Sequence, residues 1–181
     1  MLAVLALGIG SASANQPLGG VSDFEGDFAI GNWDLVNDPA GVGGSFNTNA
    51  GPPVELFVEG GDDGIGGNTD FQITIPADGE ISFDWGYQST DTECWDSGGY
   101  AINGVYTELA CNDAAVPYFD GSGTVPVSAG DVFAFRVFTV DGDFGPGILG
   151  VTNFAFQPTG DPPPSITSVT PDSGSESGGT P

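Results

Sequence analysis

The side chains that this chain could use for chemistry are almost all carboxylates. It has 25 acidic residues, a single cation at Arg136, and neither histidine nor lysine. Catalysis by Ser-His-Asp or Cys-His groups, metal sites held by imidazole and lysine Schiff bases are therefore excluded. What remains is binding of a hard cation through oxygen atoms, or glycoside hydrolysis by a pair of carboxyl groups.

An acidic, glycine-rich loop is the first candidate for a cation site. Its glycines would let it wrap around an ion, and its oxygen-bearing side chains are Asp62, Asp63, Asn68 and Asp70. Calcium suits such ligands, but the spacing matches no EF-hand, so a solvated turn is the favoured interpretation and calcium the alternative. Further candidate ligands are Glu25 and Asp27, and then Asp141 and Asp143.

Aromatic side chains next to carboxylates form the second candidate site. Sugar rings stack on Trp and Tyr faces while nearby carboxylates accept hydrogen bonds from hydroxyl groups. The best such group is Trp95 and Tyr100 with Asp91, Glu93 and Asp96. For Trp95, packing over a disulfide is favoured over a role as a sugar-binding surface.

Arg136 lies in an apolar segment, where a charge without a partner would be costly. We therefore predict a structural salt bridge to a carboxylate on another strand, with Asp84 as the suggested partner. An anion-binding role is disfavoured because the surrounding charge is so negative.

The spacing of apolar residues predicts an all-β fold. Residues 54–58 form a first strand, and residues 71–75 and 81–87 alternate apolar and polar side chains around a turn, which predicts a hairpin with Trp85 and Tyr87 in the core. Asn103-Gly104 predicts a type I′ hairpin turn. Later strands are expected at 124–127, 132–140 and 148–156. Short strands at this spacing predict an antiparallel two-sheet β-sandwich of jelly-roll type.

The two cysteines, Cys94 and Cys111, are expected to form a disulfide. No lysine, histidine or neighbouring arginine is present to activate either thiol. The disulfide would fasten the base of the hairpin that turns at Asn103-Gly104.

The net charge of −24 limits the partners of the chain. Phosphate backbones and anionic lipid headgroups would be repelled, so we expect no binding to nucleic acid or to membrane surfaces. The acidity is typical of a protein that stays soluble in a salty or calcium-rich exterior.

The two ends of the chain indicate export and further domains. Residues 1–14 combine an apolar run with Ala12-Ser13-Ala14, which predicts a signal peptide cleaved before Asn15 and no membrane insertion afterwards. The sandwich module then covers 15–159, and 160–164 form a proline-rich linker. Residues 165–181 (SITSVTPDSGSESGGTP) resemble the first strand and turn of an IPT/TIG immunoglobulin-like domain, which implies a longer multi-domain protein.

The main module also resembles a known kind of domain. The segments FEGDFAIGNW from Phe24, ISFDWGYQSTD from Ile81, GGYAINGVYTEL from Gly98 and the stretch from Ser128 to Phe156 are similar to a β-sandwich of bacterial PEP-CTERM (exosortase-sorted) surface proteins. That module is in turn loosely similar to CUB and carbohydrate-binding jelly rolls. The resemblance implies no catalytic residues.

These observations predict a secreted or cell-surface module that is not an enzyme. The favoured function is adhesion or structural support in a larger exported protein, with matrix or surface proteins as partners. The alternative is a carbohydrate-binding module that binds glycans, stabilised in some measure by calcium. A glycosidase using two of the many carboxylates is disfavoured because small sandwiches rarely form a deep cleft.

Overall fold

The computed structural model describes residues 20–91, 94–111 and 118–160. All of them belong to one compact unit that spans residues 18–160. The predicted signal peptide, most of the linker and the IPT/TIG-like segment lie outside the described residues. Among the residues described, no helix is long and apolar enough to cross a membrane.

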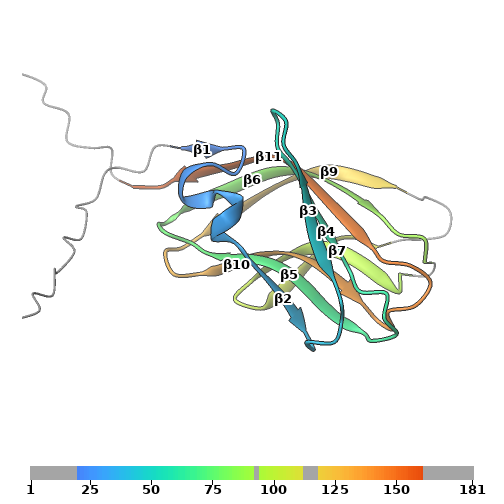
Figure 1. Ribbon diagram of the computed structural model, residues 1–181. Coiled ribbons are helices and arrows are strands. Elements are labelled where there is room, and N and C mark those ends of the chain that lie inside the picture. The colour runs from blue at the N-terminus through green and yellow to red at the C-terminus, as the bar shows by residue number, and fades with distance from the viewer. Residues whose placement is uncertain (1–19, 92–93, 112–117, 161–181) are drawn as a thin grey trace, which may run out of the picture. The chain divides into compact units, whose positions relative to one another are not determined.

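Two antiparallel sheets face each other (Figure 1). Sheet I contains, in spatial order, β3 (Ser45–Asn49), β4 (Glu55–Glu59), β11 (Ile148–Pro158), β6 (Gly79–Gln88) and β9 (Phe119–Val127), and β1 (Val21–Ser22) pairs with β11. Sheet II contains β2 (Asp34–Asp38), β5 (Gly67–Thr74), β10 (Val132–Thr139), β7 (Asp96–Ile102) and β8 (Val105–Cys111). The only helices in the described part are two 3₁₀ turns, η1 (Gly26–Phe28) and η2 (Ile30–Asn32). The fold is thus the predicted all-β, jelly-roll-like β-sandwich.

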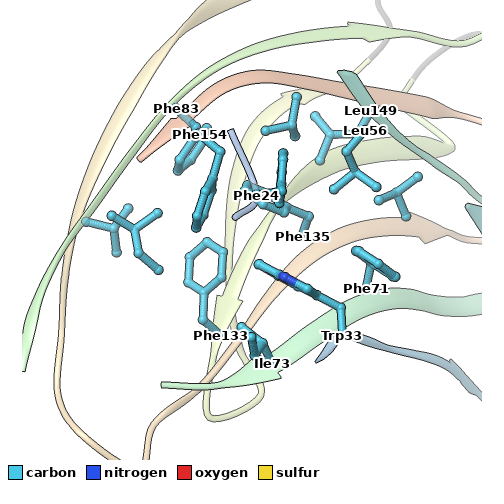
Figure 2. Close-up of a cluster of buried hydrophobic side chains, with 14 of the residues drawn as sticks. Phe24, Trp33, Leu56, Phe71, Ile73, Phe83, Phe133, Phe135, Leu149 and Phe154 are labelled. Carbon is cyan, nitrogen blue, oxygen red and sulfur yellow. The ribbon is translucent and has the colours of Figure 1, made fainter. Parts of the chain in front are cut away.

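Alternation along the strands builds the core between the sheets. On β6, Ile81, Phe83 and Tyr87 are buried and Trp85 packs against the core, while the even-numbered residues between them lie on the outer face, as period-two strands require. Trp33 follows η2 and lies among aromatic rings of both sheets, stacked on Phe71 at 5.3 Å between ring centroids (Figure 2). Its Nε1 donates a hydrogen bond of 2.9 Å to the Phe28 carbonyl, so the buried indole is satisfied.

The predicted hairpin between residues 71–75 and 81–87 is wrong. Both segments are strands, but β5 pairs with β2 and β10 in sheet II, whereas β6 pairs with β9 and β11 in sheet I. The connection between them crosses from one sheet to the other. Alternation shows which side chains face a core, and two strands can face the same core from opposite sides.

The predicted β7–β8 hairpin and its disulfide are both present. Asn103 and Gly104 have φ angles of 51° and 81°, which are the left-handed values that a type I′ turn requires. Asn103 also uses its side chain to accept a hydrogen bond from Val132 N and to donate one to Asp131. Cys94 precedes β7 and is bonded to Cys111 at the end of β8, so the disulfide closes the open end of the hairpin.

Arg136 pairs with Asp70 and not with Asp84, which corrects the predicted partner. The two residues lie directly opposite each other on β10 and β5, and the guanidinium donates two hydrogen bonds of 2.5 and 2.6 Å to the carboxylate. These bonds hold the pKa of Arg136 above its usual value. Asp84 lies on β6 in the other sheet, where its carboxylate accepts a hydrogen bond from Asn153. Asp70 is the partner because β5 lies next to β10. Apolar alternation does not encode which strands become neighbours.

Candidate functional site

A groove of about 810 Å³ crosses the outward face of sheet I. It is lined by residues of all five strands from β3 to β9. Its central row is formed by cross-strand neighbours, in the order Asn47, Phe57, Gly150, Gly86 and Asp120. The groove therefore runs across the strands. Its residues come together because β3 and β4, from the first part of the sequence, join the same sheet as β11 from its last part.

Two glycines form the floor of the groove. Gly150 and Gly86 lie opposite each other on β11 and β6. The three nearest atoms to a Cβ placed at Gly86 all belong to the Tyr118 side chain, and the nearest is its hydroxyl oxygen, so the hydroxyl end of this side chain lies over the glycine. A Cβ at Gly150 would stand 3.3 Å from the Phe57 ring. Two outward-facing aromatic rings thus flank a floor without side chains.

Carboxylates and amides line the sides of the groove. Glu55 and Glu59 stand two residues before and after Phe57 on β4, so all three share the outer face. Glu55 Oε2 accepts a 3.0 Å hydrogen bond from Asn49, and Glu59 Oε2 accepts one of 3.3 Å from Ser45.

Asp84 and Asp120 complete the set of groove carboxylates. Asp84 accepts a hydrogen bond of 2.7 Å from Asn153, which has a φ of 52° within a β-bulge of β11. Asp120 lies opposite Gly86 on β9. Gln88 and Ser122 contribute further polar groups to the lining, in which no described residue carries a positive charge. The groove can offer flat apolar faces together with many hydrogen-bond acceptors.

The predicted aromatic platform does not assemble. The Tyr100 ring faces the core, where it stacks on Phe133 at a centroid distance of 6.0 Å, so it does not form a sugar-binding surface with Trp95 as predicted. Asp91 and Asp96 are buried, and burial raises the pKa of the Asp96 carboxyl although hydrogen bonds from Thr139 and Ser89 oppose that shift. Trp95 is exposed at the end of the sandwich and stays a predicted ligand contact by itself. Glu93 lies outside the described residues.

The predicted calcium ligands do not gather into one metal-binding group in the described part of the chain. Asp70 is engaged by Arg136, and Asp62 accepts a hydrogen bond from Gly145 N, while Asp63 is exposed in the same loop. Among the residues described, no three acidic, cysteine or histidine side chains form a metal-binding group. The other predicted ligands are Asn68 on β5, exposed Glu25 and Asp27 around η1, and Asp141 and Asp143 in the loop before β11. Calcium binding by any of them stays a prediction.

Sequence reasoning missed the groove residues. Phe57 was the best available signal, because in the segment Glu55–Glu59 the buried Leu56 and Val58 alternate with an outward phenyl ring between two glutamates. The short polar strands β2 and β3 were also missed, since neither carries an apolar run. Of the two aromatic residues assigned to the core, Tyr87 is fully buried, and Trp85 packs against the core while also lining the groove.

No protein-family model and no curated protein sequence matches the chain. Among solved structures, the K1 cleaved adhesin domain of Lys-gingipain from Porphyromonas gingivalis W83 is similar, with 16% identity and a TM-score of 0.46 over 78% of this chain and 99% of that one. A family 35 carbohydrate-binding module from Clostridium thermocellum matches 77% of this chain and 92% of its own, with 16% identity and a TM-score of 0.33.

A GH26-CBM35 β-(1,4)-mannanase from Podospora anserina matches with 17% identity and a TM-score of 0.41. The match covers 81% of this chain but only 29% of the mannanase chain. At identities of 16–17%, these likenesses concern the fold alone.

Proposed function

We propose that the sandwich is a non-catalytic glycan-binding module and that the groove across sheet I is its binding site. The observation that carries this proposal is the pair of aromatic rings, Phe57 and Tyr118, on either side of the glycine floor. The apolar faces of sugar rings pack on such aromatic rings, and the surrounding carboxylates and amides would accept hydrogen bonds from the hydroxyl groups.

The shape of the groove favours a segment of a linear glycan over a single sugar. Its central row spans five strands, and four interstrand spacings of about 4.8 Å give a length of about 19 Å. A ligand lying across the strands would contact both aromatic rings along one chain. Polysaccharides and the glycan chains of cell surfaces or matrices have this extended form.

This function includes the predicted role in adhesion. A module that binds glycans on another cell or in a matrix attaches its carrier protein to them. The disulfide between Cys94 and Cys111 supports an oxidising, extracellular setting. Export through residues 1–14 and a following IPT/TIG domain from residue 165 remain parts of the same proposal.

Hydrolysis by the groove carboxylates is disfavoured by their surroundings. A glycosidase keeps one carboxyl group protonated, usually by burying it against apolar side chains. Asp84 and Asp120 are exposed, and Glu55 and Glu59 are half-buried on an open sheet face. We therefore propose binding without turnover.

The first experiment measures binding of the purified chain to an array of glycans. For a glycan that the parent chain binds on the array, Phe57→Ala and Tyr118→Ala should each weaken binding about three- to tenfold, because each removes one stacking surface. Trp95→Ala is the matched control, since it removes an exposed ring outside the groove. Loss of binding in Trp95→Ala alone would place the site at the end of the sandwich, and release of sugar products would contradict a non-catalytic role.

A second variant tests the geometry of the floor. In Gly86→Ala the new methyl group would clash with the hydroxyl end of Tyr118, a half-exposed side chain that can move away. Thermal stability should change little while glycan binding falls. Gly31→Ala is the control, since a Cβ at Gly31 meets nothing within 4 Å. Unchanged binding in Gly86→Ala would show that Tyr118 does not contact the ligand.

A further inference from the structure

We propose that the groove selects glycans that carry free, protonated amino groups, over neutral and acidic glycans. This inference rests on the proposed function and adds the chemical class of the ligand. Four carboxylates line the groove, namely Glu55, Glu59, Asp84 and Asp120. Acidic residues are common on a chain with this net charge, but these four surround the surface formed by Phe57, Tyr118 and the glycine floor, which we call the aromatic seat. A sugar ring can lie on this surface.

The four carboxylates stand on both sides of that seat. Glu55 and Glu59 flank Phe57 along β4, at a distance of two residues in each direction. Asp84 stands two residues before Gly86 on β6, and Asp120 lies opposite Gly86 on β9. A chain lying on Phe57 and Tyr118 would therefore pass between negative charges along its whole contact.

None of these charges is neutralised by a cation of the protein. Three of the four accept a hydrogen bond through one oxygen from a neutral donor: Glu55 from Asn49, Glu59 from Ser45 and Asp84 from Asn153. The one cation of the sequence, Arg136, lies on sheet II and is held by Asp70. Within the described ranges, the second oxygen of each of these three carboxylates has no hydrogen bond, so it can accept one from a ligand.

Ammonium groups match this arrangement better than other sugar substituents. An ammonium donates three hydrogen bonds and its charge complements the carboxylates. A carboxylate or sulfate on a sugar would meet four negative charges and no counter-ion from the protein, so it would be repelled. N-acetylation removes the charge from the same nitrogen. An amino sugar oligomer and its N-acetylated form are therefore a matched pair of ligands with the same sugar chain.

The experiment is calorimetric titration of the full chain with three tetramers, in the presence of a chelator that excludes bridging metal ions. The tetramers are of glucosamine, of N-acetylglucosamine and of galacturonic acid. We expect the glucosamine tetramer to bind at least fivefold more tightly than the acetylated one, and the galacturonic acid tetramer not to bind. Raising the salt from about 0.05 to about 0.5 M should reduce this preference, because exposed charges are then screened.

Variants distinguish the contribution of the carboxylates to binding from that of the aromatic seat. Glu55→Gln and Asp120→Asn should each weaken glucosamine binding about two- to fivefold and leave binding of the acetylated tetramer unchanged. Glu80→Gln is the matched control, because Glu80 lies on the same strand as Asp84 but does not line the groove. Phe57→Ala should weaken both tetramers.

Two results would overturn the inference in distinguishable ways. Equal or tighter binding of the acetylated tetramer, lost in Phe57→Ala, would reject selection for amino groups and leave the glycan-binding function standing. If no tetramer binds and no glycan on the array binds, the inference and the proposed function both fail.

Discussion

At the scale of single residues, the pairing of Arg136 with Asp70 is the most consequential contact. Both side chains are about 10% exposed, so the ion pair is largely removed from water. The Arg136 guanidinium also lies 5.7 Å from the centre of the Tyr106 ring. Removing one partner would leave a buried charge without compensation.

Asp70→Asn should therefore lower the free energy of unfolding by about 3 kcal/mol, measured by urea denaturation. Asp84→Asn is the control, because it removes an exposed carboxylate of sheet I and should cost much less. The double variant Asp70→Leu with Arg136→Met should recover much of the loss. A larger loss in Asp84→Asn than in Asp70→Asn would contradict this pairing.

Asp96 gives the fold a dependence on pH. Its pKa is raised by burial, so between the usual carboxyl pKa and the raised value the folded chain binds more protons than the unfolded chain. Stability should fall as the pH rises through that window. Asp96→Asn should flatten this part of the profile and be the more stable protein at neutral pH. The measurement is Tm from about pH 4 to about pH 7, and a variant profile as steep as that of the parent would count against this assignment.

At the scale of elements, the β7–β8 hairpin is closed at its two ends by different means. Asn103 and Gly104 supply the turn, and the disulfide ties Cys94 to Cys111 across 17 residues. The chain between the cysteines is restricted in the unfolded state, which favours folding.

Replacing both cysteines by serine should lower the free energy of unfolding by about 3 kcal/mol, as expected for a loop of this length. Urea denaturation of the oxidised parent and of the double variant measures the difference. A reducing agent should bring the parent to the stability of the variant and leave the variant unchanged. If reduction leaves the parent unaffected, the disulfide adds no stability.

At the scale of the whole molecule, the net charge of −24 opposes the compact state. Raising NaCl from about 0.01 to about 1 M shortens the screening length from about 30 to about 3 Å. Tm should therefore rise with salt, with most of the gain at low concentration. A Tm that stays constant or falls would mean that self-repulsion does not limit stability.

Calcium is tested by the same melting experiment at matched ionic strength. If Asp62 and Asp63 or another of the predicted sets binds the ion, millimolar CaCl₂ should raise Tm beyond the effect of NaCl, because a ligand that binds only the folded state stabilises it. Asp62→Asn with Asp63→Asn should remove the extra shift. Equal melting in the two salts would end the calcium prediction.

The sequence by itself determined the all-β class, the Asn103-Gly104 turn and the disulfide, and it excluded imidazole and amine catalysis. These depend on composition and on alternation and turn residues close together in the chain. The tertiary structure decided that β5 and β6 belong to different sheets, that Arg136 faces Asp70, and that the groove exists. Each of these depends on which strands become neighbours, and that choice is made by packing of distant segments around one core.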